Sequence, residues 1–411
     1  MPASAARSNP VRPFSSRRVL LGVTGGIASY KSAWLARQLT QATAEVDVVL
    51  TRSATEFVGA VTFEALTGRP VHTALVQAGH ALDHIHLARA ADLVIIAPAT
   101  ADFMARAATG RGNDLLSACL LATTAPVLFV PAMNDRMWAH GQTQRNVAHL
   151  RELGYHVLDP DVGELAVGEG SGPGRMPEPE TILAHAGRLI ETTDALRGRR
   201  VVVSAGPTRE AVDPVRFISN RSSGKMGVAI AAAAWRRGAE VVLVAGPLSI
   251  DAPVGPRLRA VETTEDMLEA VRDEIKAADV LVMAAAPADF RASSVATSKV
   301  KKANAPNALA LETTPDILRE TIPLRPPGMI AVGFALETDD VLKNGTAKLE
   351  EKCLDLIVTN DAREQGAGFS VDTNRVTMLA RDGTRTDLPL LPKTEVADAI
   401  LDRIVELMNG R

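Results

Sequence analysis

Small residues follow the first apolar run of the N-terminal half, at a point where they could approach a phosphate. Val19–Val23 is followed closely by Gly25, Gly26, Ile27 and Ala28, and a helical pattern begins there. Glycines at a strand-to-helix turn let the backbone come close to a ligand, and the helix N-terminus adds N–H donors. The G-x-G-x-x-G spacing of dinucleotide-binding loops is absent, so a tight turn without a ligand is the alternative.

Hydroxyl and amide side chains also follow the next three apolar runs. They are Ser53 after Val46–Thr51, Thr100 after Leu93–Ala97, and Met133-Asn134 after Val127–Pro131. Open parallel sheets bind ligands at the carboxyl ends of their strands, so one shared site is expected. Each residue alone could simply cap a helix, since Ser, Thr and Asn are preferred N-caps.

A histidine pair lies between the apolar runs Val46–Thr51 and Leu93–Ala97. His84 and His86 precede the strand that starts near Leu93. A histidine beside a strand-end pocket can act as a base near neutral pH, which favours His84 as a catalytic candidate. Surface histidines and metal ligands are the alternatives, and no Cys or Glu lies nearby to complete a metal site.

Cations gather after the strand-like runs of the C-terminal half. Arg216, Asn220 and Lys225 surround two serines and a glycine, just before an Ala-rich helix. This pattern is typical of a phosphate site, although the Walker spacing is absent. Further along come Asp289, the lysine-rich stretch from Lys299 to Lys302, and Lys348 with Lys352 on one helical face. So many cations indicate a polyphosphate ligand, with a solvated loop as the alternative for the lysine-rich stretch.

Two sets of alternating strands and helices must position these side chains. In the first half the expected strands are Val19–Val23, Val46–Thr51, Leu93–Ala97, Val127–Pro131 and His156–Leu158. In the second they are Val201–Ser204, Glu240–Ala245, Val280–Ala284, Ile330–Phe334 and Leu356–Thr359. Runs of Val, Ile and Leu bounded by Gly and Pro predict parallel strands buried on both faces. The fold class is therefore α/β, with two doubly wound Rossmann-like domains.

The sequence also predicts where these domains begin and end. We expect a disordered tail at 1–17 (a targeting segment is the alternative), a first domain at 18–191, a linker at 192–198 and a second domain at 199–411. The Gly- and Pro-rich stretch 163–178 is interpreted as a long functional loop. Ile27, Tyr30, Trp34, Leu35 and Leu39 fall on one helical stripe. Asp382-Gly383 predicts a hairpin that adds an antiparallel piece to the second sheet.

Composition excludes several classes of protein. The chain has 411 residues, a formal net charge of −3 and two cysteines. Two cysteines exclude a disulfide scaffold and four-cysteine zinc sites, and they favour a reduced cytoplasmic location. The small net charge gives no sign of a nucleic-acid partner or an anionic membrane surface. No apolar run reaches the ~18 residues that a bilayer span needs.

The first-half motifs, taken together, resemble the flavin-dependent cysteine decarboxylases. The resemblance rests on Gly25 to Lys31, His84-Ile85, Pro98 to Asp102, Pro131 to Asn134, and Gly172 to Met176. It implies a flavodoxin-like domain in which Gly25, Gly26, Ile27, Ala28, Ser53 and Thr100 contact FMN. It also implies that His84 is the base, that Met133 and Asn134 bind substrate, with Asn134 orienting its carboxylate, and that the Gly-rich stretch closes over the substrate. Such a cofactor supplies the electron sink that a simple thiol lacks when CO2 leaves.

One feature departs from that family. Many of its members place a cysteine before the Gly-rich stretch as a proton donor, whereas this chain has Leu165-Ala166-Val167-Gly168 there. Neither Cys119 nor Cys353 matches the motif, so the proton donor is unassigned.

The second half resembles the phosphopantothenate–cysteine ligases of the bifunctional coenzyme A biosynthesis family. The resemblance implies that CTP, with Mg2+, contacts Asp289, Lys299, Pro315, Asp316, Ile317, Leu318, Phe334, Lys348 and Lys352. It implies that Asn220 contacts an acyl-cytidylate intermediate, that Lys299 supports amide formation, and that Arg216 is part of the substrate loop. The Mg2+ ligands are unknown. Pro287, where relatives usually carry Val, removes a backbone donor beside the site.

Both resemblances together imply two consecutive reactions and a homo-oligomer. CTP-dependent ligation of cysteine to 4′-phosphopantothenate is followed by FMN-dependent decarboxylation to 4′-phosphopantetheine, with trimeric flavin domains and dimeric ligase domains. Two alternatives are a flavin-binding regulatory subunit and a cysteine decarboxylase that acts on a peptide C-terminus. The fused ligase half argues against both.

Overall fold

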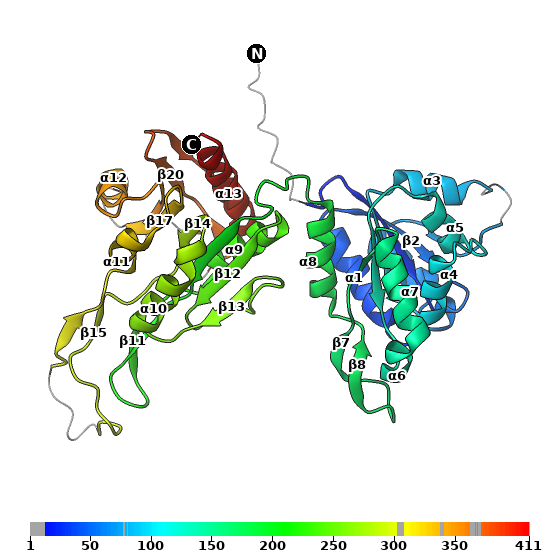
Figure 1. Ribbon diagram of the computed structural model, residues 1–411, viewed down its shortest axis with the longest axis horizontal. Coiled ribbons are helices and arrows are strands. Elements are labelled where there is room, and N and C mark those ends of the chain that lie inside the picture. Colours follow the sequence, from blue (N-terminus) through cyan, green and yellow to red (C-terminus); the bar gives the residue numbers. More distant parts are fainter. Residues whose placement is uncertain are drawn as a thin grey trace, which may run out of the picture. The chain divides into compact units, whose positions relative to one another are not determined.

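The computed structural model divides the chain into two compact units, Met1–Thr192 and Thr193–Arg411, each described by itself (Figure 1). The structure describes residues 13–410 apart from 77–78, 80, 302–307, 338–340, 362–365, 367 and 369–370. Lys302 and the first twelve residues of the predicted tail therefore lie outside the described residues. In the part of the chain that is described, no helix is long and apolar enough to cross a membrane.

A six-stranded parallel sheet forms the centre of the N-terminal unit, in the order β3-β2-β1-β4-β5-β6. Its strands are β1 (Arg18–Val23), β2 (Glu45–Leu50), β3 (Val71–His72), β4 (Leu93–Ala99), β5 (Val127–Pro131) and β6 (His156–Val157). Without the two-residue edge strand β3, the order is the 2-1-3-4-5 of flavodoxin-like sheets. The predicted flavodoxin-like class is confirmed, with one short strand added at the edge.

Helices cover both faces of this sheet because its strands are apolar on both sides. Alternate residues of β1 face opposite cores: Val19 and Leu21 pack with helices on one face, and Leu20 packs with those on the other. One face holds α1 (Ser29–Gln41), α2 (Ala60–Thr67) and α8 (Pro179–Ile190). The other holds α3 (Asp83–Ala90), α4 (Ala101–Ala108), α5 (Leu115–Ala122) and α7 (Gly141–Glu152).

Three expectations for the N-terminal unit need correction. The tail is shorter than predicted, because Phe14 is buried in the core and Arg17 pairs with Asp92. The predicted α1 stripe divides: Leu35 and Leu39 are buried, whereas Ile27, Tyr30 and Trp34 are exposed. The predicted long loop contains an antiparallel hairpin of β7 (Asp161–Glu164) and β8 (Ser171–Arg175), which extends beside α6 (Asp135–Ala139) in Figure 1.

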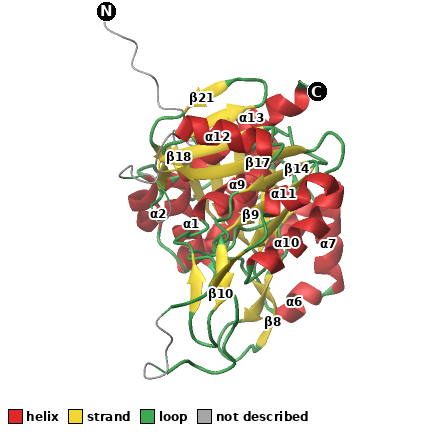
Figure 2. Ribbon diagram, turned by 90° about the vertical axis from the view of Figure 1, so that its left-hand side faces the viewer, coloured by secondary structure: helices red, strands yellow, loops and turns green. Residues whose placement is uncertain are grey.

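An eight-stranded mixed sheet forms the centre of the C-terminal unit, in the order β13-β12-β9-β14-β17-β18-β20-β21 (Figure 2). Its strands are β9 (Arg200–Ala205), β12 (Glu240–Ala245), β13 (Arg257–Ala260), β14 (Val280–Met283), β17 (Ile330–Glu337), β18 (Leu356–Asp361), β20 (Thr377–Ala380) and β21 (Arg385–Asp387). The predicted hairpin at Asp382-Gly383 is confirmed, since β20 pairs antiparallel with both β18 and β21.

The C-terminal unit has the same three-layer construction. One face of its sheet packs against α9 (Lys225–Arg236) and α13 (Lys393–Asn409). The other packs against α10 (Thr264–Glu274), α11 (Ile317–Thr321) and α12 (Val341–Glu351). Small two-stranded sheets add β10 (Arg209–Ala211) with β11 (Phe217–Ser219), β15 (Phe290–Ala292) with β16 (Leu311–Thr313), and β19 (Thr373–Asn374) with β22 (Leu391–Pro392). The predicted linker is partly structural, because Leu196 is fully buried in this core.

Two candidate active sites

A cavity of about 530 Å³ lies at the carboxyl edge of the N-terminal sheet. It is lined by Gly25, Gly26, Ile27, Ala28, Tyr30, Lys31, Thr100, Ala101, Ala132, Met133, Asn134, Met137, Glu164, Leu165, Ala166, Glu169, Gly174, Arg175 and Met176. The loop after β1, Thr100 and the Met133-Asn134 pair therefore converge on one site, as their strand-end positions predict. The β7–β8 hairpin contributes the wall that no strand-end motif supplies.

The two glycines of the loop after β1 meet different surroundings. A Cβ atom on Gly25 would clash with Ser53, whereas one on Gly26 would have no neighbour within 4 Å. Ser53 in turn contacts the hydroxyl of Thr51 at 3.2 Å. Ser53 therefore supports the loop from behind and is not among the described residues that line the cavity, while Gly26 leaves open space at its surface.

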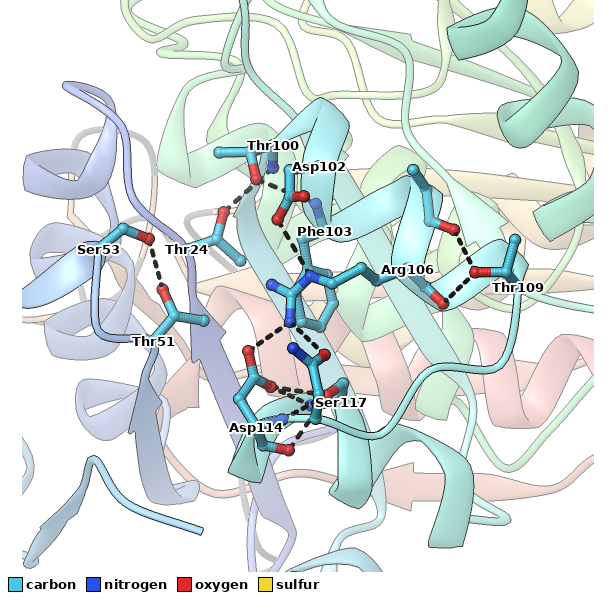
Figure 3. Close-up of polar contacts among 12 residues, drawn as sticks. Thr24, Thr51, Ser53, Thr100, Asp102, Phe103, Arg106, Thr109, Asp114 and Ser117 are labelled. Carbon is cyan, nitrogen blue, oxygen red and sulfur yellow. Dashed lines mark hydrogen bonds and ion pairs between the residues drawn. The ribbon is translucent and has the colours of Figure 1, made fainter.

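Thr24 fastens the first loop to the loop after β4 (Figure 3). Its hydroxyl donates to the carbonyl of Pro98 at 2.7 Å and accepts from the N–H of Thr100 at 3.1 Å. The Thr100 hydroxyl accepts from the N–H of Phe103 at 3.3 Å and so caps α4. Capping and a place in the cavity are thus compatible roles for Thr100.

Below this loop, Arg106 holds two helices together (Figure 3). Its guanidinium bonds Asp102 at 3.0 Å and Asp114 at 2.6 Å, and Asp114 caps α5 through Ser117. Burial raises the pKa of Asp114, but the hydrogen bonds from Arg106 and Ser117 together outweigh this effect. The pKa of Asp114 therefore lies below its usual range. This cluster supports the cavity and does not line it.

Asn134 is held by its own helix and by the hairpin. Its Oδ1 accepts from the N–H of Arg136 at 3.0 Å, and its Nδ2 donates to Glu169 Oε2 at 3.2 Å. The hairpin can come this close because its second strand is glycine-rich. A Cβ on Gly174 would clash with the Met133 carbonyl, and Gly174 accepts from the Met133 N–H at 3.0 Å.

A buried lysine ties α1 to the chain that leaves the hairpin. Lys31 Nζ donates to the Met176 carbonyl at 2.7 Å and contacts Glu178 at 3.0 Å. Glu178 also bonds Arg175 at 2.6 Å. The base of the hairpin is therefore fixed to the helix that begins at the Gly25–Ala28 loop.

His84 is half-buried in the first turn of α3, and the structure does not bring it into the cavity wall. Because α3 runs back from the carboxyl edge to the start of β4, its first turn is at the same edge as the cavity. The Nδ1 atom of His84 is buried and has no hydrogen-bond partner among the described residues. The predicted base is thus at the correct edge, outside the set of described residues that line the cavity.

The cysteines do not supply a reactive thiol to this cavity. Cys119 is fully buried in α5, and burial, followed by the charges of Asp114 and Asp83, raises its pKa to about 12. A thiol in that state is inert as an acid at neutral pH. Cys353 is not among the described residues that line this cavity, and in the segment 165–168, where many family members place a cysteine, Val167 is exposed at the hairpin tip.

A second cavity, of about 320 Å³, lies at the carboxyl edge of the C-terminal sheet. Two predicted site residues line it, Asn220 and Phe334. Asn220 Nδ2 donates to the carbonyls of Ala286 at 3.2 Å and Pro287 at 2.8 Å. The oxygen of Pro287 therefore helps to position Asn220, whereas its nitrogen has no donor to offer.

A buried carboxylate organises the loop that carries Arg216. Asp213 accepts from the N–H groups of Val215 at 2.8 Å, Arg216 at 2.9 Å and Val300 at 3.2 Å. These bonds, that of Val215 first, outweigh desolvation and lower the pKa of Asp213. Arg216 also donates to the Val300 carbonyl at 3.1 Å, so its loop is joined to the loop of the exposed Lys299.

The other predicted nucleotide contacts form a separate cluster. The Asp289 carbonyl accepts from the Thr314 N–H at 3.0 Å, and Asp316 pairs with Lys352 at 2.9 Å. Burial raises the pKa of Asp316, but the hydrogen bond and charge of Lys352 hold it below its usual range. Pro315 joins the two contacts, while Lys348, one turn before Lys352, is on α12.

Ile317 and Leu318 differ from the other predicted nucleotide contacts in their burial. Both side chains are buried in the core beneath the sheet, so only their backbone could face a nucleotide.

Three polar residues of the second cavity were missed from sequence. Lys393, Asn360 and Asn374 line it together with Lys225, which was recognised only as part of a phosphate-like loop. Asn360 is near the end of β18, where the strand-end rule could have found it. Lys393 and Asn374 have no local signature, because tertiary packing alone brings them to the cavity.

Comparison with known proteins decides the family. A family described as Flavoprotein matches residues 7–191, and one described as DNA/pantothenate metabolism flavoprotein C-terminal domain matches residues 196–408. The coenzyme A biosynthesis bifunctional protein CoaBC of Mycobacterium tuberculosis is 47% identical over 410 residues, covering 96% of this chain and 97% of the relative. The chain belongs to the CoaBC family. The CoaBC protein of Bacillus subtilis is 44% identical over 398 residues, covering 96% and 98%.

As a CoaBC protein, the chain joins a flavoprotein decarboxylase half to a ligase half of coenzyme A biosynthesis. A crystal structure of the C-terminal domain of a CoaBC protein is 41% identical and covers 53% of this chain and 100% of its own, with a TM-score of 0.46. A crystal structure of the FMN-dependent cysteine decarboxylase SpaF is 32% identical to this chain. It covers 43% of this chain and 97% of its own, with a TM-score of 0.38.

The residues of the first cavity fit a flavin. Gly26 leaves space at the start of α1 that any side chain would reduce, and the loop N–H groups there suit a phosphate. In the C-terminal unit the donor set suits an anion, and within the described residues there is no group of three or more His, Cys, Asp or Glu side chains that could hold a metal ion.

Proposed function

We propose that this CoaBC protein first ligates cysteine to 4′-phosphopantothenate with CTP and then decarboxylates the product to 4′-phosphopantetheine with FMN. The observation that supports this proposal is that each half has its own cavity at the carboxyl edge of its own sheet. Each cavity also holds residues that the family motifs place there, namely Asn134 in the first and Asn220 in the second.

In the decarboxylase half, the Gly25–Ala28 loop and Thr100 would hold FMN, with Ser53 behind the loop. FMN, when bound, supplies the oxidation of the thiol-bearing carbon that makes loss of CO2 feasible. Asn134 orients the substrate carboxylate through its Nδ2 donor, and Met133 contacts the substrate beside it. The hairpin covers the substrate and excludes water, and His84 acts as the base.

In the ligase half, the carboxylate of 4′-phosphopantothenate attacks the α-phosphorus of CTP and releases pyrophosphate. The amine of cysteine then displaces CMP from the acyl-cytidylate, so that one amide bond forms as one acyl–phosphate bond breaks. Asn220 and Arg216 position the intermediate, and Lys299 stabilises negative charge during amide formation. Lys348 and Lys352 offset the charge of the triphosphate, which carries Mg2+.

The exposed apolar residues support a homo-oligomer. Ile27, Tyr30 and Trp34 form an exposed stripe at the start of α1, directly beside the first cavity. In the C-terminal unit, Val215 and Phe217 are exposed on the β10–β11 arm. We propose that these surfaces serve trimeric flavin domains and dimeric ligase domains, respectively. Multi-angle light scattering of the full chain, and of a Trp34→Glu and a Phe217→Glu variant, tests this assignment.

A single incubation tests the two-step proposal. The purified protein receives 4′-phosphopantothenate, cysteine and CTP with Mg2+, and pyrophosphate, CO2 and the amide product are measured. Equal yields of pyrophosphate and CO2 are expected. Pyrophosphate without CO2 from flavin-loaded protein would leave only the ligase and favour a regulatory flavin domain, whereas CO2 from a cysteine-ended peptide would favour the peptide alternative. The cytoplasmic location stays a prediction from cysteine usage.

A further inference from the structure

The ligase cavity carries an imbalance of charge that its predicted site residues do not explain. Among the described residues that line it are two lysines, Lys225 and Lys393, and no aspartate or glutamate. The other polar residues that line the cavity are neutral, namely Asn220, Ser222, Ser223, Asn360 and Asn374. A concave surface with two cations and only neutral donors around them favours an anionic ligand.

Lys393 is unusually buried for a lysine that opens onto a cavity. Lys393 as a whole is 5% exposed to solvent. Its Nζ donates to the carbonyl oxygens of Gly368 at 2.8 Å and Val371 at 2.6 Å. Burial, and then the charge of Lys225, lower its pKa to about 8, while the charge of Asp372 acts in the opposite direction. An anion bound near this ammonium would stabilise its charged form against the cost of burial.

Lys225 contacts a carboxylate from the same stretch of chain. Its Nζ is 2.6 Å from Oδ1 of Asp372, whose side chain is 89% exposed. Asp372 also accepts, through its backbone oxygen, the N–H of Lys393 at 2.9 Å. The carbonyl oxygens of Gly368 and Val371 thus contact the Lys393 ammonium, and the Asp372 carboxylate contacts the Lys225 ammonium. An exposed ion pair contributes little to stability, so a better anion can replace it.

The local backbone fixes where these lysines lie. Each is the first residue of a long helix, α9 for Lys225 and α13 for Lys393. Gly224, just before α9, has a φ of +79°, and a Cβ there would clash with Leu248, so only glycine permits this approach. The position of Lys225 at the cavity is therefore set by tertiary packing, and not by a flexible surface loop.

We propose that Lys225 and Lys393 together form an anion subsite that binds a phosphate group of a ligase substrate, and that this phosphate displaces Asp372 from Lys225. The subsite rests on the proposed ligase function. It adds Lys393, which no motif indicated, to Lys225, which the sequence indicated only as part of a phosphate-like loop. The phosphate comes either from the triphosphate of CTP or from the phosphomonoester of 4′-phosphopantothenate. Both offer several anionic oxygens, which suit two ammonium groups.

Binding measurements on the full chain separate these sources. Lys393→Gln, Lys225→Gln and a surface control, Lys276→Gln, are titrated by calorimetry with CTP plus Mg2+, with pyrophosphate, and with 4′-phosphopantothenate, each alone. Both subsite variants are expected to weaken one ligand class about tenfold or more, since each loses a charged hydrogen bond. Weaker CTP and pyrophosphate binding assigns the triphosphate, and weaker 4′-phosphopantothenate binding assigns the monoester. Lys276→Gln, whose side chain is 68% exposed outside the cavity, should match the wild type.

Two further variants keep the proposal open to refutation. Lys393→Arg retains the charge and should restore most of the affinity if Lys393→Gln is poorly folded. Asp372→Asn should bind the same ligand severalfold more tightly, because it removes the internal competitor. Unchanged affinity for all three ligands in folded Lys225→Gln and Lys393→Gln would overturn the subsite, and weaker binding by Asp372→Asn would overturn the displacement. A wild-type chain that binds none of the ligands would instead refute the ligase function.

Discussion

The side-chain amide of Asn134 donates a hydrogen bond to the carboxylate of Glu169 at 3.2 Å, across the cavity of the flavoprotein half. Asn134 is the residue expected to hold the substrate carboxylate, and Glu169 is in the β7–β8 hairpin between its strands. The hairpin thus places a carboxylate of its own where a substrate carboxylate is expected to bind.

We therefore expect Glu169→Ala and Glu169→Gln to strengthen binding of 4′-phosphopantothenoylcysteine. The bound substrate no longer has to break a protein contact, so KM for CO2 release should fall roughly two- to fivefold, the scale of one exposed hydrogen bond. Glu152→Gln, on the exposed side of α7, is the matched control. A rise in KM in the Glu169 variants would show that this carboxylate assists binding instead.

Gly26→Ala should lower the affinity for FMN while the fold is retained. The added methyl group meets no protein atom within 4 Å, so it must project into the cavity. Overpacking against a bound cofactor costs about 1–3 kcal/mol, or roughly tenfold in affinity. The ratio of flavin to protein absorbance after dialysis measures this change. Gly141→Ala is equally unobstructed but is outside the cavity, and it should retain flavin fully.

His84→Asn should abolish CO2 release and leave pyrophosphate release unchanged. Loss of a general base costs about 100-fold or more in rate, and the two reactions use separate halves of the chain. Paired assays of CO2 and pyrophosphate on one preparation check this. If both products disappear, His84 has been misassigned. If neither changes, the base is another residue.

Lys299→Gln should slow formation of the amide more than formation of the acyl-cytidylate. This loop contacts Arg216 through the Val300 carbonyl, so loss of the exposed Lys299 side chain should leave the loop in place while removing a charge. A rapid-quench experiment would show a preserved burst of pyrophosphate and an amide rate about tenfold lower. Equal slowing of both steps would contradict a role specific to amide formation.

Phosphate binding in the ligase half should weaken as the pH rises through about 8, because Lys393 then loses its proton. Among the described residues, the charges of Lys225 and Asp372 act on this ammonium. Lys393→Arg should give a flatter profile by calorimetry between pH 7 and 9.5, since arginine stays charged. Equal pH dependence in both proteins would exclude Lys393 as the titrating group.

Stability should change in the opposite direction over that range. The folded-state pKa of Lys393 lies below its ordinary value of 10.5, so between about 8 and 10.5 the unfolded chain binds more protons. This group therefore makes the free energy of unfolding rise with pH there. Urea titrations of wild type and Lys393→Gln at pH 7.5 and 9.5 should show the smaller rise in the variant.

Strand positions could be predicted from the sequence because burial on both faces leaves an uninterrupted apolar run. Val19–Val23 and Glu240–Ala245 match β1 and β12 to within one residue. Residues that follow such strands, such as Thr100 and Asn134, then converge on a cavity through topology alone.

The β7–β8 hairpin and the position of Lys393 could not be predicted in that way. Glycines 172 and 174 resemble loop residues, but they are needed because β8 packs against Asp135 and Met133. Lys393 follows a proline at a helix start, and only the folded sheet brings it opposite Lys225. In the same way, Ile317 and Leu318 belong to a family motif, yet their side chains serve the core.

The buried carboxylate of Asp213 has a consequence for how this chain can vary. Because one side chain binds the backbone at both Arg216 and Val300, the two loops share a single anchor although 84 positions separate them. An insertion or deletion between the anchor and either cation would shift one positive charge relative to the other. The lengths of these two loops should therefore be inherited together, even where the residues around them diverge.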